Sequence, residues 1–208
     1  MSKLLYIEAS PLKSRSHTVA VAQAFLDAYR LAHPYDEIER LDLWQTALPP
    51  FDAQTIEAKF AVLRRNEFTP EQFERWEAVR RVSRHFNAAD KYVFGVPMWN
   101  FGVPYVLKHY IDVVTLPGEN WSWSREAGYG TLLSGKSALA IYASANLHEQ
   151  TGEGADDFQR PFMRRWLRFI GVEDVQEITV SPTLSDPETV ARVRTEAIGR
   201  AIQLASRF

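Results

Sequence analysis

The sequence contains no cysteine, and this absence removes several kinds of chemistry at once. Disulfide bonds, thiolate catalysis, iron–sulfur clusters and cysteine-ligated zinc sites all require that side chain. An excess of one charge is also missing, because 24 basic and 26 acidic side chains leave a formal net charge of −2. Without a strongly basic surface, nucleic acid is not an expected partner.

Long apolar runs are missing too. No stretch approaches the roughly 20 residues that a membrane-spanning helix needs. The N-terminal residues carry no signal-peptide pattern, because Glu8 interrupts the apolar run that begins at Leu4. We therefore expect a protein with no membrane span and a cytoplasmic location.

The chain has 208 residues, 46% of them apolar, which suits a single domain over residues 1–208 with a substantial core. Short apolar or alternating runs, typical of strands, recur along the sequence. They cover residues 3–9, 37–43, 91–96, 137–143 and 175–180. Segments with helical spacing of apolar residues lie between and after them. These cover residues 17–32, 54–68, 69–86, 104–114, 156–170 and 186–206.

Five strands that alternate with helices predict an α/β fold, a parallel sheet with helices on both faces. Five strands favour the flavodoxin-like order 2-1-3-4-5 over a full dinucleotide-binding Rossmann fold. Such sheets bind ligands beyond the carboxyl ends of their strands. We therefore expect the loops at residues 10–18, 97–103 and 143–154 to line a functional site.

The first loop lacks the G-x-G-x-x-G pattern of dinucleotide-binding proteins and enters a helix through Ser16, His17 and Thr18. A helix N-terminus presents free N–H groups and the positive end of a dipole, so it can hold one phosphate, with the two hydroxyls as further donors. Plain N-capping by Ser16 explains the same pattern. His17 either approaches the phosphate as a cation or faces solvent, and Lys13 and Arg15 are expected to be solvated.

The second loop holds two prolines and two glycines within ten residues, which predicts an unusual backbone path. Such a loop can aim backbone N–H and C=O groups at the edge of a flat ring. Asn100 offers both a donor and an acceptor, which matches the mixed edge of a flavin, and Met98 and Trp99 can cover its face. The alternative is a buried corner filled by rings. Aromatic residues that crowd into this part of the sequence are Trp99, Phe101, Trp121 and Trp123.

These motifs together resemble those of a known family. The P-M-W-N-F of residues 97–101 and the P-x-x-L-K-x-x-x-D of residues 104–112 are similar to a signature of FMN-dependent NADH-azoreductases and quinone reductases. Ser10 with residues 16–18 resembles the phosphate loop of that family, and residues 169–175 resemble its turn into the last strand. The matches fall in the right order and span most of the chain.

The resemblance implies a set of residues that contact the cofactor. They are Ser10, Ser16, His17, Thr18, Pro97, Met98, Trp99, Asn100, Phe101, Ser144, Ala145 and Asn146. Two departures from the family pattern stand among them. Trp99 replaces a common tyrosine, and A-S-A-N at residues 143–146 replaces S-R-G-G, which removes an arginine and two glycines near the flavin pyrimidine.

By the same resemblance, noncovalently bound FMN receives a hydride from NADH or NADPH, and a quinone or azo compound is then reduced in the same place. This ping-pong scheme needs no obligatory catalytic side chain, because the flavin carries the chemistry. A homodimer with the site partly closed by the second subunit is also implied.

Two other functions stay open, a flavodoxin-like electron carrier with protein partners and a flavin-free α/β binding domain. Carriers usually show a strongly acidic docking face, and the net charge of −2 is mild. No metal site is expected, because His148-Glu149 begins like a zinc-protease helix but lacks a second histidine four residues later.

Overall fold

The computed structural model describes residues 1–148 and 155–208. Its centre is a five-stranded sheet of order β2-β1-β3-β6-β7, in which all neighbouring strands are parallel. The strands are β1 (Lys3–Glu8), β2 (Glu37–Asp42), β3 (Lys91–Pro97), β6 (Ser137–Ala143) and β7 (Asp174–Val180). Counted within this sheet alone, the order is the expected 2-1-3-4-5, because the two further strands found among the described residues do not join it.

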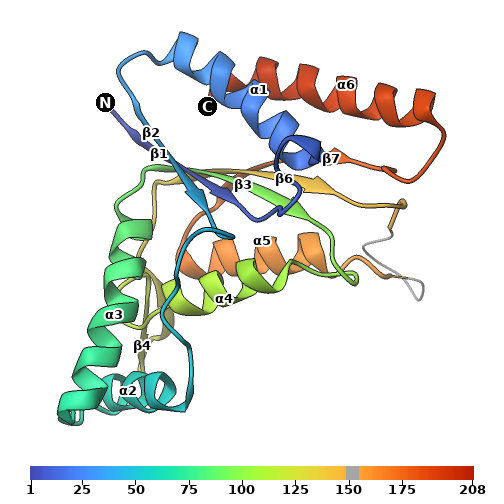
Figure 1. Ribbon diagram of the computed structural model, residues 1–208. Helices are drawn as coiled ribbons and strands as arrows, with labels where there is room; N and C mark the ends of the chain where they lie inside the picture. The colour runs from blue at the N-terminus through green and yellow to red at the C-terminus, as the bar shows by residue number, and fades with distance from the viewer. Residues whose placement is uncertain (149–154) are drawn as a thin grey trace.

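Helices cover both faces of the sheet (Figure 1). On one face, α1 (His17–Ala32) and α6 (Pro187–Ala205) lie side by side. The other face carries α4 (Tyr105–Val114) and α5 (Gln159–Ile170). The buried apolar residues form a separate cluster on each face, as expected for strands that are covered on both sides.

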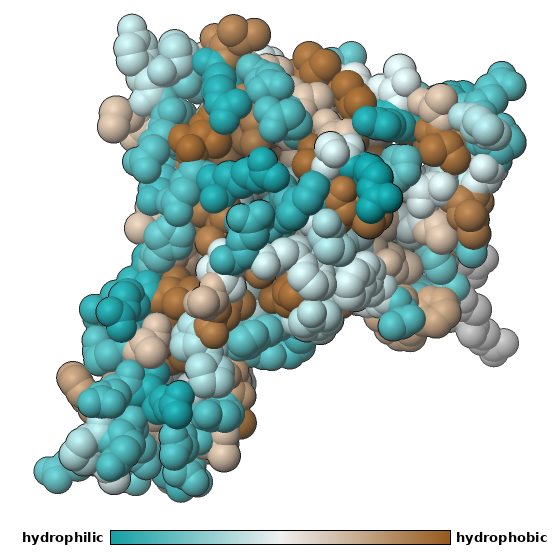
Figure 2. All heavy atoms as spheres, viewed as in Figure 1, coloured by the Kyte–Doolittle hydropathy of each residue, from teal (hydrophilic) through white to brown (hydrophobic). Residues whose placement is uncertain are grey.

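A helical hairpin of α2 (Ala53–Arg64) and α3 (Pro70–Asn87) extends beyond the sheet at the lower left of Figure 1. A capping box begins α3: Thr69 Oγ1 accepts from Gln72 N at 3.2 Å, and Gln72 Oε1 accepts from Thr69 N at 3.1 Å. Figure 2 shows that this arm is largely hydrophilic, while hydrophobic residues on the same view form separate patches. None of the described helices is both long and apolar enough to cross a bilayer.

Residues 116–136 lie between two of the expected elements and contain an antiparallel hairpin of β4 (Trp121–Ser124) and β5 (Gly128–Thr131). The hairpin packs near the end of α5, where the Trp121 ring lies 5.5 Å from that of Phe169, centroid to centroid. Leu133 N donates to the Ile170 carbonyl at 3.0 Å and ties the same regions together.

Gly171 connects α5 to the segment before β7 and has a φ of 103°. A Cβ atom at this position would lie 3.0 Å from Thr131 Cβ and 3.2 Å from the Leu133 backbone. Both the left-handed backbone and the close approach of the hairpin therefore require glycine here.

We predict that Gly171→Ala lowers the free energy of unfolding by about 2–4 kcal/mol. This is the sum of two costs, that of an alanine in the left-handed conformation and that of overpacking against the hairpin. Gly135→Ala is the matched control, because Gly135 has a φ of 80° but no atom within 4 Å of the added Cβ. That control should lose only about 1–2 kcal/mol. Urea unfolding measures both values, and equal losses would refute the close-contact explanation.

Candidate functional site

Four loops meet at the carboxyl ends of the parallel strands. They follow β1, β3, β6 and β7, and the first three are the loops that the sequence singled out. Met98 N donates to the Ala143 carbonyl at 2.7 Å, and Ser144 N donates to the Val180 carbonyl at 3.3 Å, so neighbouring loops are joined directly. The predicted third loop continues through residues 149–154, which lie outside the described residues.

The first loop enters α1 through a pair of buried hydroxyls. Ser16 Oγ lies 3.1 Å from Thr18 Oγ1 and also accepts from Val19 N at 3.4 Å. Ser10, likewise buried, accepts from Leu12 N at 3.4 Å. Ser16 is thus an N-cap, and the hydroxyl pair lies next to the N–H groups of the first helical turn, an arrangement suited to a phosphate.

His17 follows the cap, and its Nδ1 atom is buried without a hydrogen-bond partner in the described part of the chain. Burial, assisted by the positive charge of Arg194 on α6, lowers the pKa of the His17 imidazole. The neutral ring is therefore favoured, so His17 suits a hydrogen bond to a ligand better than it suits a permanent positive charge.

Lys13 differs from its predicted solvated state. Its Nζ atom bonds to Glu8 and to Asp42, the last residues of β1 and β2. Arg15, two residues later, is exposed as expected. The sequence could not distinguish the two side chains, because the carboxylates that Lys13 meets come from separate strands.

The second loop is a tight turn whose ends pair with each other. Trp99 N donates to the Gly102 carbonyl and Gly102 N to the Trp99 carbonyl, both at 3.0 Å. The central residues Asn100 and Phe101 have φ values of 46° and 68°. A positive φ in a residue other than glycine costs of the order of 1–3 kcal/mol, and such residues are concentrated at functional sites. The turn uses the amides of its end residues, so the N–H groups of Asn100 and Phe101 remain at its exposed tip.

The start of α5 braces this strained turn. Phe158 N donates to the Phe101 carbonyl at 2.9 Å. Gln159, which is 1% exposed, donates from Nε2 to the Val96 carbonyl at 3.1 Å. Asp157 Oδ1 accepts from Gln159 N and fixes that residue in turn. The helix predicted to start at residue 156 begins at Gln159, because the preceding residues are engaged with the loop.

The third loop is fastened to the loop after β7, which the sequence did not single out. Ser144 Oγ and Ser181 Oγ lie 2.8 Å apart, and each donates to the Asn146 carbonyl at 2.7 Å. Thr183 N donates to the carbonyls of Ser144 and Ala145 at 3.0 and 3.1 Å. The carbonyls of all three loop residues are therefore held by the β7 loop.

This loop departs from the resembled pattern in two ways with different consequences. None of residues 143–148 has a positive φ, so the backbone path here does not require the missing glycines. The missing arginine has no counterpart at Ser144, whose side chain is nearly buried and turned toward Ser181.

His148, considered from the sequence only as a metal ligand, is brought to the site by the fold. Its Nδ1 atom lies 2.9 Å from Asp156 Oδ2, and its ring meets that of Phe101 edge-on at a centroid distance of 6.0 Å. With Met98 and Ser144 it lines a cavity of about 80 Å³ behind the third loop. Within residues 1–148 and 155–208, no group of three or more His, Asp or Glu side chains could hold a metal.

The aromatic residues that crowd together in the sequence fall into two separate groups in the structure. The Trp99 ring lies 5.7 Å from that of Trp44 and 6.0 Å from that of Tyr105, whereas Trp121 packs against Tyr129 and Phe169. Beside the first group opens a cleft of about 760 Å³. It is lined by Pro50, Phe51, Asp52, Trp99, Asn100, Val103, Tyr105, Lys108, His109 and Asp112.

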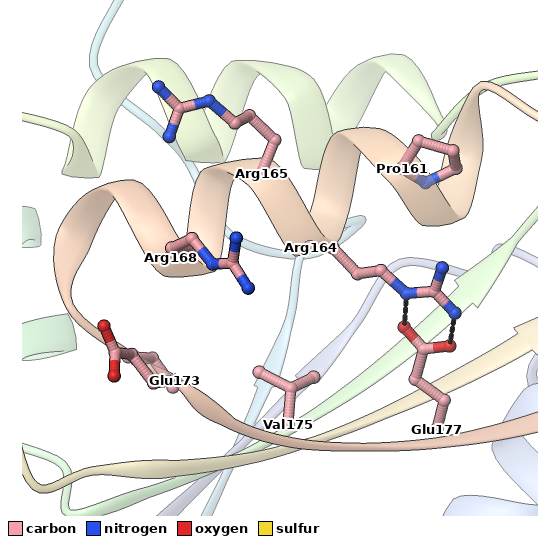
Figure 3. A pocket seen from close by; sticks show the side chains of 8 residues that line it. Pro161, Arg164, Arg165, Arg168, Glu173, Val175 and Glu177 are labelled. Carbon is pink, nitrogen blue, oxygen red and sulfur yellow. Dashed lines mark hydrogen bonds and ion pairs between the residues drawn. The ribbon is translucent and has the colours of Figure 1, made fainter.

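A second cleft, of about 680 Å³, runs between α5 and the edge strand β7 (Figure 3). A two-pronged ion pair between Arg164 and Glu177 bridges it, and Arg165 points away from the strand. Charged side chains of this kind protect a sheet edge from pairing with another chain. The cleft follows the flank of β7 rather than the carboxyl ends of the strands, so we do not assign it to the candidate site.

Comparisons with known proteins agree on one fold. A family model described as a flavodoxin-like fold matches residues 2–204. A protein of Desulfotalea psychrophila named FMN-dependent NADH:quinone oxidoreductase is 42% identical over 205 residues, 99% of this chain and 97% of its own length. An azoreductase structure from Bacillus anthracis aligns with a TM-score of 0.89 and 26% identity, covering 100% of both chains. An FMN-dependent NADH-azoreductase from the same species, solved in complex with FMN, aligns with a TM-score of 0.83 and 26% identity, covering 99% of this chain and 100% of the other.

Proposed function

The chain belongs to the flavodoxin-like family, with FMN-dependent NADH:quinone oxidoreductases among its full-length relatives, and on this premise we propose that it passes reducing equivalents from NADH through FMN to a quinone or azo compound. FMN supplies the hydride chemistry when bound, while the protein supplies binding, orientation and electrostatics. One observation carries the proposal: a helix N-terminus with buried hydroxyls lies at the same edge of the sheet as a strained turn whose two central amides have no hydrogen-bond partner among the described residues.

The phosphate end of FMN would bind at the start of α1. Ser16 and Thr18 would donate hydroxyl hydrogens, and the first-turn N–H groups would add charge-favoured hydrogen bonds. A single helix terminus accommodates one phosphate, which favours FMN over FAD. Ser10 and His17 complete this end of the proposed site.

The ring of FMN would bind between the second and third loops. The amides of Asn100 and Phe101, held at a rigid tip, are suited to the polar edge of the ring, and the Asn100 side chain adds a donor and an acceptor. Pro97, Met98 and Trp99 form the adjoining wall. Residues 144–146 lie at the neighbouring strand end, where the bonds from the β7 loop keep their backbone in place.

The cleft beside Trp99 and Tyr105 is our proposed site for the reaction partners. Its aromatic wall suits planar molecules, and nicotinamide and acceptor would occupy it in turn, which yields ping-pong kinetics. A homodimer is also proposed, since Trp123 and Tyr129 of the hairpin are 53% and 68% exposed. The cytoplasmic location stays a prediction from the sequence.

The direct test is to identify the released cofactor by mass spectrometry and to assay quinone and azo reduction with NADH and with NADPH. We expect noncovalent FMN and parallel double-reciprocal plots. FAD as the native cofactor would contradict the cofactor assignment, and intersecting lines would contradict the shared site. Reduction of a protein partner without reduction of small acceptors would favour the electron-carrier alternative.

Replacing both Ser16 and Thr18 by alanine should weaken FMN binding at least tenfold. Each hydrogen bond lost to a charged group costs about 1.5–3 kcal/mol before compensation. Ser14→Ala is the matched control, because Ser14 is an exposed serine of the same loop. Fluorescence titration of the apoprotein gives the dissociation constants, and equal values in the wild type and the double variant would show that Ser16 acts as a helix cap alone.

Ser144→Arg should raise the midpoint potential of the bound flavin. Reduction adds negative charge to the ring, and a nearby cation stabilises that charge. A shift of about 30 mV corresponds to about 1.4 kcal/mol for a two-electron couple. Ser144→Ala is the control, since it also breaks the bond to Ser181 without adding charge. Redox titration compares the two variants, and an equal or lower potential in the arginine variant would contradict the prediction.

A further inference from the structure

Glu8, the last residue of β1, has a completely buried side chain close to the phosphate loop. Its Oε1 atom lies 3.1 Å from Lys13 Nζ and its Oε2 atom 2.5 Å from Arg40 Nη2. The Tyr6 hydroxyl donates to Oε2 at 3.3 Å. A buried carboxylate is costly unless it is paired and hydrogen-bonded, so these partners account for its presence inside the protein.

Lys13 links this carboxylate to the neighbouring strand. Its Nζ atom also lies 2.5 Å from Asp42 Oδ2, at the end of β2. The Lys13 backbone has a φ of 52°, and its carbonyl accepts from Ser16 N at 2.9 Å. The side chain is thus anchored at two strand ends while the backbone holds the residue that caps α1.

Tyr6 extends the cluster toward the hydroxyl pair. A Cβ atom on Gly95 would lie 3.2 Å from the Tyr6 hydroxyl and 3.5 Å from Thr18 Oγ1, so both oxygens flank the same position of β3. Thr18 Oγ1 in turn contacts Ser16 Oγ. A series of polar side chains therefore leads from Asp42 to the residues that would hold a phosphate.

We propose that Glu8, Lys13 and Asp42 form a clamp that positions the phosphate loop, and that Lys13 is a positioning residue rather than a ligand of the phosphate. The inference rests on the proposed binding of FMN at Ser16 and Thr18. The ammonium group of Lys13 is already engaged by two carboxylates, and with Arg40 the four formal charges of the cluster cancel. The cluster therefore acts through geometry, by holding a left-handed residue in place before the ligand arrives.

The two roles of Lys13 predict opposite effects when Asp42 is neutralised. In the clamp, Asp42→Asn releases the lysine, the loop loses its geometry, and FMN binds more weakly. If Lys13 instead served as a source of positive charge for the phosphate, removing the competing carboxylate would make FMN bind more tightly. Asp42 is partly exposed, so this variant disturbs the buried Glu8 least.

The experiment titrates the apoprotein with FMN and with riboflavin, which lacks the phosphate. We expect Asp42→Asn and Lys13→Met each to weaken FMN binding about tenfold with riboflavin binding unchanged, and the double variant to be no weaker than either single one. Lys13→Arg should restore part of the affinity. Arg15→Met is the matched control, because it removes the same charge from an exposed residue of the same turn.

Tighter or unchanged FMN binding by Asp42→Asn would overturn the clamp. A loss in Arg15→Met equal to that in Lys13→Met would also overturn it, because net charge would then explain both. Circular dichroism spectra matching the wild type establish that each variant is folded. If the wild type binds FMN no better than riboflavin, the proposed phosphate site fails, and the clamp fails with it.

Discussion

The parallel pairing of β1, β3 and β6 is the constraint on which the rest of this structure depends. β3 pairs with β1 from Leu4 opposite Lys91 onward and with β6 from Lys91 opposite Ser137 onward, so the three strands run in the same direction and their carboxyl ends lie at the same edge of the sheet. Their side chains are buried on both faces, which leaves the carboxyl ends as the place where loops can hold polar groups. The loops that make up the candidate site all lie along this edge, so the strand pairing determines where they are.

At that edge the loops obtain rigidity from different sources. The turn at Asn100 and Phe101 carries unfavourable positive φ values, and the hydrogen bond from Phe158 to its backbone helps to hold it. The loop at Ser144 has an ordinary backbone, and hydroxyls of the β7 loop hold its carbonyls. Both devices fix the direction of backbone groups before a ligand binds, which lowers the entropy lost on binding.

Much of the fold could be predicted from the residues, because the signals were local. The helix expected at residues 17–32 depends on the local spacing of its apolar residues, and it was found as expected. Features that depend on residues far apart in the sequence were not predicted correctly. Lys13 was expected in solvent but meets carboxylates of two strands, and Trp99 and Trp121, close in the sequence, pack in different clusters.

The sequence by itself determined the five strands of the central sheet and their order, the approximate extent of the six α-helices, and the motifs that place the chain among its relatives, because apolar periodicity and turn residues act over short distances. Only the tertiary structure decided which polar groups share the site. The contacts of Glu8 with Arg40, of Ser144 with Ser181 and of His148 with Asp156 depend on where strands end and loops cross. Interacting side chains on different strands or loops have no fixed spacing along the chain, so no pattern of residues predicts their contacts.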